Sequence, residues 1–258
     1  MVLNIAGYHF VRIDDPRALL LRLRQQAEAF ALLGTVLVAG EGVNLFLAGS
    51  EVGVEAFLEQ LQADPHFAGM VVKRSRSQGQ PFARLKVKLK REIIAFRRDG
   101  ATPVDARAPA VAPDILARWI RQGCDDAGKR LVLLDTRNRE EVVHGTFAGA
   151  LTLPIDKFTD LPQALTPHRT ALADATVVAF CTGGIRCEKA ALWMRGQGMD
   201  NVLQLDGGIL GYFDQVGGHG YDGHCFVFDA RVALDSALRP MVDAHCEVPA
   251  VLQGGTDR

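Results

Sequence analysis

The segment "CTGGIR", residues 181–186, separates a cysteine from an arginine by four residues, two of which are glycines. The apolar run "ATVVAF" before it predicts a buried strand, and "CEKAALWMRGQG" after it predicts a helix. In a loop between strand and helix, successive N–H groups and the helix N-terminus can converge on one anion. We therefore predict that Cys181 is a nucleophile whose pKa lies below the ~8.5 of a free thiol.

The other loop residues fit the same interpretation. Gly183 and Gly184 permit positive φ values and a close approach of the backbone, and Arg186 adds a permanent positive charge. Thr182 and Ile185 complete the predicted active-site loop. A C-x5-R loop, one residue longer, is sized for phosphate, so the shorter C-x4-R spacing favours a single bound sulfur.

A second cysteine, Cys187, falls in the first turn of the predicted helix. It is either a small buried side chain or a redox partner of Cys181. Cys124 is interpreted as structural or incidental. Cys225 and Cys246 stand beside His224 and His245 and could in principle bind a metal with them, but adjacent residues are poor joint ligands. Five cysteines at irregular spacing, without a C-x-x-C pair, predict free thiols and no metal site.

Two further segments contribute candidate site residues. Asp135 and Arg137 follow the predicted strand "LVLLD" and so lie at a strand end, as Cys181 does. Glu41 and Asn44 lie in the turn "GEGVN". That turn is either a simple hairpin connection or a segment that reaches across to the cysteine loop.

The periodicity of the chain predicts two domains. Residues 1–98 predict the order β-α-β-β-α-β of a ferredoxin-like α+β sandwich. The expected elements are a strand at 4–13, a helix at 15–33 closed by Gly34, strands at 35–40 and 43–49, a helix at 50–64, and strands at 70–77 and 83–96. A Pro- and Ala-rich linker at 99–112 leads to a parallel α/β domain at 113–217 and a tail at 218–258.

The first domain contains a basic segment. Between Lys73 and Arg98 there are ten basic residues and one acid, although the formal net charge of the chain is -1. Alternation in "RLKVKLK" predicts a basic face of Arg84, Lys86, Lys88 and Lys90, with Leu85, Val87 and Leu89 on the core side. This row is either a solvated surface or a phosphate-binding face for RNA.

Composition limits the remaining classes. With 258 residues, 48% hydrophobic and 23% charged, the chain can form two modest cores. The N-terminus does not show a charged segment leading into an apolar one, and no 18 consecutive residues are apolar. We expect a cytoplasmic protein without membrane contact.

The second half resembles a rhodanese domain. The shared features are the D-x-R of Asp135 and Arg137, an acidic pair, "GTFAGA" at 145–150 and the C-x4-R loop. The whole chain resembles the rhodanese-related tRNA uridine(34) hydroxylase family, through "GTVLVAGEGVN", "FARLKVKLKREII", "CTGGIRCEKAA", "LDGGILGYF" and "GHCFVFDARVA". Near the end the resemblance stops, because family members have C-x2-C pairs where this sequence has His245 and Cys246.

The resemblance implies an oxygen-dependent enzyme that introduces a hydroxyl at C5 of the wobble uridine of tRNA and needs Cys181. Residue chemistry alone favours an alternative, a sulfurtransferase that carries sulfur from thiosulfate or a protein persulfide on Cys181. A binding module without turnover is a third hypothesis. A minimal sulfurtransferase does not need the first domain, so whole-chain resemblance favours the hydroxylase. No flavin, haem or iron-site motif is recognisable; the implied partners are tRNA, molecular oxygen, and a sulfur or electron donor.

Overall fold

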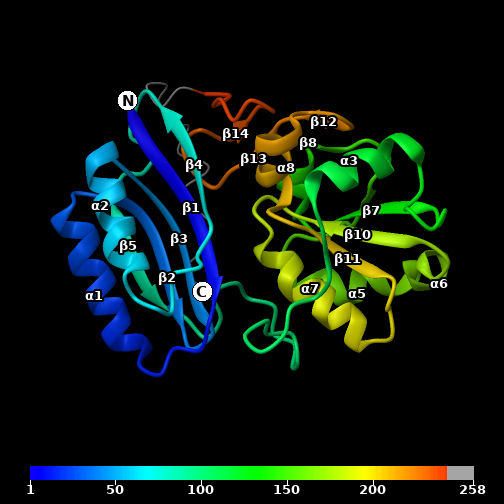
Figure 1. Ribbon diagram of the computed structural model, residues 1–258, viewed down its shortest axis with the longest axis horizontal. Coiled ribbons are helices and arrows are strands. Elements are labelled where there is room, and N and C mark those ends of the chain that lie inside the picture. The colour runs from blue at the N-terminus through cyan, green and yellow to red at the C-terminus, as the bar shows by residue number, and fades with distance from the viewer. Residues whose placement is uncertain (243–258) are drawn as a thin grey trace.

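Two β-sheet domains form the protein, and the face of the first sheet that carries no helices is turned toward the second domain (Figure 1). The computed structural model describes residues 1–242. Within these residues, no helix is both long enough and apolar enough to cross a membrane.

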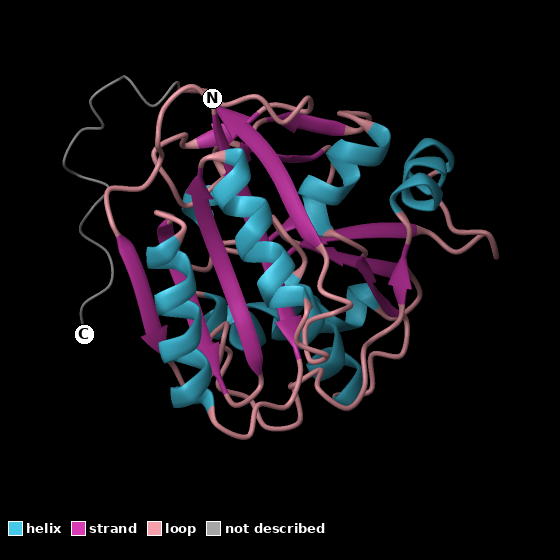
Figure 2. Ribbon diagram, turned by 60° about the vertical axis from the view of Figure 1, so that its left-hand side comes forward, coloured by secondary structure: helices cyan, strands magenta, loops and turns pink. Residues whose placement is uncertain are grey.

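The first sheet has the strand order β4-β1-β3-β2-β5. Its elements are β1 (Val2–Phe10), α1 (Pro16–Ala29), β2 (Leu33–Ala39), β3 (Gly42–Gly49), α2 (Glu51–Gln62), β4 (Val72–Ser77) and β5 (Leu85–Leu89). Strands β4, β1, β3 and β2 are antiparallel, as the ferredoxin-like prediction requires, and β5 adds a parallel edge strand beside β2. Helices α1 and α2 lie side by side across one face (Figure 2).

Capping residues explain where the two helices begin. Asp15 accepts hydrogen bonds from the backbone N–H groups of Arg17 and Ala18, and Ser50 caps α2 in the same way. The predicted end of α1 was wrong. The helix ends at Ala29 because Ala31 takes a positive φ of 54°, and Gly34 lies in β2 instead of closing the helix.

Two other predicted strands in this domain are shorter than expected. The strand predicted at 4–13 is β1 and ends at Phe10, and the one predicted at 83–96 is confined to Leu85–Leu89. The chain leaves the sheet after Leu89 because the N–H groups of Ile93, Phe96 and Arg97 bond to carboxylates of Glu41 and Glu92 rather than to a neighbouring strand.

The second sheet is parallel throughout, as predicted, with the order β6-β11-β10-β7-β9. Its strands are β6 (Ala110–Val111), β7 (Leu131–Asp135), β9 (Leu151–Thr152), β10 (Thr176–Phe180) and β11 (Val202–Leu205). The helices are α3 (Pro113–Gln122), α4 (Arg139–Val142), α5 (Leu161–Leu165), α6 (Arg169–Leu172), α7 (Ile185–Gly196) and α8 (Gly208–Val216), with 3-10 turns at Phe158–Asp160 and Thr166–His168. Helices α3 and α8 cover one face, and α5, α6 and α7 cover the other.

The predicted linker and tail are more ordered than the sequence suggested. Strand β6, within the linker range, pairs with β11 at the edge of the second sheet. In the tail, β12 (Tyr221–Gly223) pairs with β8 (Gly145–Phe147), and β13 (Cys225–Phe226) pairs with β14 (Ala233–Leu234). His245 and Cys246 lie outside the described residues.

Candidate active site between the two domains

Cys181 is the first residue after β10, so it lies at the carboxyl end of the central strand of the parallel sheet. The neighbouring strands β7 and β11 end beside it, in Asp135 and Leu205. Ligand sites of parallel α/β sheets form at such strand ends. The structure thus confirms the predicted strand–loop–helix arrangement.

The loop surrounds the Cys181 sulfur with hydrogen-bond donors. The N–H of Gly184 donates to Sγ at 3.2 Å, and the N–H groups of Arg186 and Cys187 donate to the same sulfur. Gly184 has a φ of 101° and is the N-cap residue of α7, so the helix N-terminus is directed at the sulfur. The predicted convergence of backbone amides is therefore present.

The segment "LDGGI" holds the loop in this orientation. The N–H of Ile209 donates to the carbonyl oxygen of Cys181 at 2.9 Å, and that of Leu210 donates to the carbonyl of Thr182 at 3.0 Å. Because these carbonyls are bound on that side, the following N–H groups point toward the sulfur. Gly208 has a φ of 63°, and a Cβ there would lie 2.5 Å from the Cys181 carbonyl oxygen. This close approach requires glycine.

Arg186 is fixed by a buried carboxylate that sequence reasoning had only noted as part of an acidic pair. Its two terminal nitrogens donate to Glu141 at 2.5 and 2.7 Å, and the guanidinium also bonds to the Cys181 sulfur. Thr182 donates to Glu141 at 3.2 Å. Burial raises the pKa of Glu141, but Arg186 outweighs this and holds it below its usual range.

The electrostatics of the loop favour a thiolate at Cys181. Burial alone would raise the pKa, but the hydrogen bond from Cys187, the charge of Arg186 and the loop amides together lower it well below the ordinary thiol value. In Cys187 the pKa is raised, first by burial and then by the neighbouring Cys181. The Cys187 thiol, which lies 3.5 Å from Thr136 Oγ1, therefore keeps its proton beside the Cys181 thiolate.

Asp135 and Arg137 form a buried ion pair of their own. Arg137 Nε and Nη2 donate to the Asp135 carboxylate at 3.0 and 2.7 Å, and Nη2 also reaches the carbonyl of Gly145. Thr146 donates to the same carboxylate at 2.7 Å. These contacts tie the end of β7 to β8. The two side chains support the wall of the site, and a direct role for them stays a prediction.

Two residues of the first domain reach the loop, and sequence reasoning did not identify either as a site residue. Lys73 Nζ, from β4, donates to the carbonyl of Gly183 at 2.9 Å. The Tyr8 hydroxyl, from β1, lies 2.8 Å from where a Cβ on Gly184 would be and donates to Glu188 at 3.3 Å. Both lie on the sheet face opposite α1 and α2, so the first sheet forms one wall of the site.

Glu188 in turn is a buried junction of both domains and the linker. Besides Tyr8, its carboxylate accepts hydrogen bonds from Arg107 Nε at 3.0 Å and from Gln204 Nε2 at 3.0 Å. It lies four residues beyond Gly184, in the first turn of α7. The start of this helix is therefore fixed by contacts from three parts of the chain.

The "GEGVN" turn also reaches the second domain. Glu41 accepts a hydrogen bond from Lys189 Nζ in α7 at 2.7 Å, while Asn44 donates to the carbonyl of Ile93 at 3.1 Å. Ile93 packs against Ile185 of the loop. Glu41 thus makes a direct contact with the helix that follows the loop, and Asn44 acts through Ile93.

The basic segment divides between the two faces of the first sheet. Arg74 and Arg76 lie on the helix-covered face, paired with Glu55 and Glu51 of α2. Lys73 lies on the other face, which carries no helices. The register of β5 beside β2 places Lys86 and Lys88 on this same helix-free face.

The ends of the predicted basic row lie just outside β5. Arg84, Lys86 and Lys90 are exposed and Lys88 is partly buried. The predicted core side holds for Val87 and Leu85 but is wrong for Leu89, which is 43% exposed because it ends an edge strand. RNA binding by the row stays a prediction.

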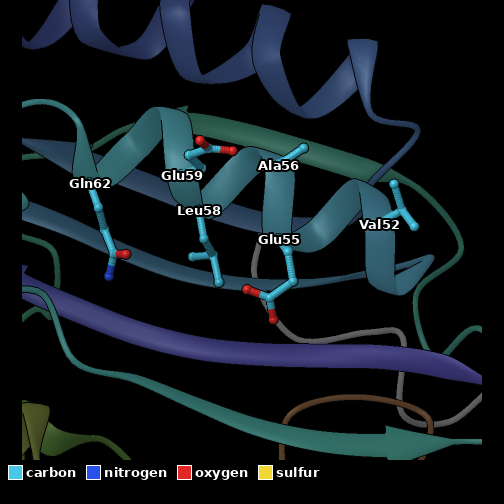
Figure 3. Close-up of a pocket in the computed structure, with 6 residues that line it drawn as sticks. All are labelled: Val52, Glu55, Ala56, Leu58, Glu59 and Gln62. Atoms are coloured by element: carbon cyan, nitrogen blue, oxygen red, sulfur yellow. The ribbon is translucent and has the colours of Figure 1, made fainter.

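A surface hollow on α2 lies apart from this site (Figure 3). It is lined by Val52, Glu55, Ala56, Leu58, Glu59 and Gln62. Since α2 covers the opposite face of the first sheet, the hollow is remote from Cys181 (Figure 1). Among residues 1–242, no three His, Cys, Asp or Glu side chains cluster to hold a metal ion.

The fold and the C-x4-R loop define a rhodanese-type protein with an additional N-terminal domain. Residues 2–93 match the family described as "UPF0176 acylphosphatase like domain", and residues 114–215 match "Rhodanese-like domain". A rhodanese-like domain from Anabaena, solved by NMR, is 19% identical and covers 45% of this chain and 79% of its own, with a TM-score of 0.36.

Relatives extend over nearly the whole chain. A protein of Xanthomonas axonopodis pv. citri is 67% identical over 95% of this chain and 98% of its own length. One from Xylella fastidiosa is 59% identical over 94% of this chain and 95% of its own. Both are named tRNA uridine(34) hydroxylase. The chain belongs to the tRNA uridine(34) hydroxylase family.

Proposed function

We infer that this protein hydroxylates uridine 34, the wobble uridine of tRNA, at C5, with Cys181 as the nucleophile. The observation that supports this most strongly is a thiolate-stabilising loop contacted by Lys73 and Tyr8 of the first domain. A minimal sulfurtransferase needs no such second wall. The relatives that match nearly the whole chain, over both of its domains, are named tRNA uridine(34) hydroxylase.

The chemistry of the pyrimidine ring suits a cysteine thiolate. Uracil C6 is electrophilic, and addition of a thiolate there moves an electron pair to C5, which then becomes the nucleophilic carbon. Molecular oxygen is the proposed co-substrate that receives this electron pair. The loop amides and Arg186 keep the thiolate available near neutral pH.

The tRNA is proposed to lie along the helix-free face of the first sheet, from the β5 edge toward the site between the two domains. Lys86 and Lys88 share this face with Lys73, whose ammonium group lies at the loop. Alternate residues of one strand are about 6.5 to 7 Å apart, comparable to the spacing of phosphates along one nucleic-acid strand. Such a row would bind backbone and leave the choice of base to the site itself.

Mass spectrometry of tRNA from a deletion strain tests this assignment. Complementation with the intact gene should restore 5-hydroxyuridine at position 34, whereas Cys181→Ser should not. Cys124→Ser is the matched control, because Cys124 pairs with Arg130 in an isolated bridge outside the loop. Restored modification by the Cys181→Ser protein would contradict the proposed role of the thiolate.

The second candidate is a sulfurtransferase in which Cys181 carries a persulfide. The loop geometry favours it, since the amides that bind the thiolate would equally bind a terminal persulfide sulfur. Incubation with thiosulfate followed by intact mass measurement distinguishes the two. A stable gain of one sulfur on Cys181, with tRNA from the deletion strain unchanged in its uridine 34, would favour this reaction over hydroxylation.

A further inference from the structure

Hydroxylation by molecular oxygen needs a source of electrons. One oxygen atom enters the base and the other leaves as water, which consumes two electrons and two protons beyond those of the uracil. This requirement follows from the proposed function, on which the present inference rests. A pair of thiols that becomes a disulfide supplies two electrons and two protons.

The structure has such a pair at the reacting atom. Cys187 Sγ lies 3.5 Å from Thr136 Oγ1, which donates to the carbonyl of Phe180, the residue before Cys181. Both cysteine side chains are fully buried in the same core cluster, so the two thiols are neighbours. The two residues are brought together because Cys181 begins the loop and Cys187 lies in the first turn of α7, and both help form the same core. Loop and helix are anchored independently, by Ile209 and by Glu188.

We propose that Cys187 is the reductant of the reaction, so that the Cys181–Cys187 dithiol ends each turnover as a disulfide. Overall, uridine, one O2 and two thiols give 5-hydroxyuridine, one water and one disulfide. Cys187 is then a catalytic residue, because it contacts the reacting sulfur. Burial and the nearby Cys181 raise the pKa of Cys187, so it keeps its proton until it reacts.

The Cys181 thiolate, whose proton has left to solvent, forms a bond to C6, and the electron pair that moves to C5 forms a C5–O bond with dioxygen. Protonation gives a C5 hydroperoxide. The Cys187 sulfur attacks the outer oxygen and breaks the O–O bond, which leaves a C5 hydroxyl and a sulfenic acid on Cys187. Loss of the C5 proton expels Cys181 from C6 and restores the ring double bond.

The freed Cys181 thiolate then attacks the Cys187 sulfenic acid. A sulfur–sulfur bond forms, and the sulfenic oxygen takes up a proton and leaves as water. A thiol reductant, such as dithiothreitol in vitro, returns the disulfide to the dithiol by exchange. The next turnover can then begin.

A reaction without external thiol tests the inference directly. The reduced full-length protein, freed of reductant, is mixed in air with unmodified tRNA, and hydroxyuridine and the 181–187 disulfide are both measured by mass spectrometry. We expect equal amounts of the two, a stop after one turnover, and resumption on adding dithiothreitol. Without tRNA, the thiols should persist over the same time.

Cys187→Ser is the informative variant, because a serine hydroxyl keeps a hydrogen-bond donor beside Cys181 but cannot supply electrons. It should lose the single-turnover product and regain part of it when dithiothreitol is present. The rate of Cys181 alkylation reports whether its loop is intact. Cys124→Ser should behave as the wild-type protein does.

The outcomes separate the two proposals. A full burst from Cys187→Ser without thiol, or wild-type product without disulfide, would overturn the role of Cys187 and leave the hydroxylase assignment standing. No hydroxyuridine from the wild-type protein with both oxygen and dithiothreitol present would contradict the proposed function itself.

Discussion

Cys181 of the second domain and Cys225 of the tail that packs against it are both fully buried thiols, yet their pKa values move in opposite directions. At Cys225, burial dominates and raises the pKa to about 12, although Arg137 lowers it. At Cys181, the same cost of burial is outweighed by donors from the loop and by Arg186. Burial alone therefore makes a thiol inert, and the orientation of the loop makes one reactive.

The contrast depends most on the buried ion pair. Replacing Arg186 with Met should leave the Glu141 carboxylate buried and unpaired and cost about 3 to 5 kcal/mol of unfolding free energy. It should also raise the Cys181 pKa toward that of Cys225. Denaturant unfolding and alkylation rates measure the two effects.

Arg139→Met is the matched control for this change. Arg139 pairs with Asp156, but both side chains are mostly exposed, and exposed pairs contribute about 0 to 1 kcal/mol. Equal destabilisation by the two substitutions would contradict the claim that the buried Arg186–Glu141 ion pair stabilises the loop.

The backbone of the loop can be altered without removing a charge. Gly184→Ala should cost roughly 1 to 3 kcal/mol, because Gly184 has a φ of 101° and a Cβ there would lie 2.8 Å from the Tyr8 hydroxyl. The rate of tRNA hydroxylation should fall together with the stability. Gly183→Ala is the control, since a Cβ at that position has no heavy atom within 4 Å. A Gly184→Ala protein with wild-type stability and activity would show that this geometry is not needed.

Lys73 tests whether the first domain contributes to the thiolate. Lys73→Met removes a cation at the loop, so the Cys181 pKa should rise and its alkylation rate near pH 7 should fall by about threefold to tenfold. Lys86→Met should leave the alkylation rate unchanged. Lys86 shares a face of the sheet with Lys73, but it lies on β5, at the opposite edge of the sheet from β4. A fall of similar size in both would indicate a general effect of charge rather than this contact.

The basic row should affect binding more than chemistry. Replacing Lys86 and Lys88 with Ala should weaken tRNA binding and lower the slope of log affinity against log salt by up to about two units. Filter binding across a salt series measures this, while Cys181 alkylation should not change. An unaltered affinity and slope would make the row an ordinary solvated surface.

Sequence alone predicted those parts of the site that are contiguous in the chain. The loop from Cys181 to Arg186 could be read from its glycines and spacing, and the helices and hairpin from caps and alternation. Even there, the end of α1 was misplaced, because Gly34 can close a helix or, as here, serve a strand where Phe46 approaches closely.

The residues that sequence reasoning missed come from distant parts of the chain. Lys73 lies 110 residues before Gly183, and Tyr8 lies 180 residues before Glu188. Within the sequence, Lys73 is one of ten basic residues in a run. Alternation along the strand indicates on which face of the sheet Lys73 lies, but it does not indicate what that face contacts. Docking of the two domains supplies that information.

The pH dependence of alkylation tests the central claim most directly. The native protein is treated with iodoacetamide over a pH series, and modification of Cys181 and Cys225 is followed separately by peptide mass spectrometry. A lowered pKa means that Cys181 becomes reactive as pH rises through a midpoint well below the ~8.5 of a free thiol, while Cys225 stays unmodified across the range. A Cys181 midpoint at or above ~8.5 would contradict the account of the loop as a thiolate-stabilising site.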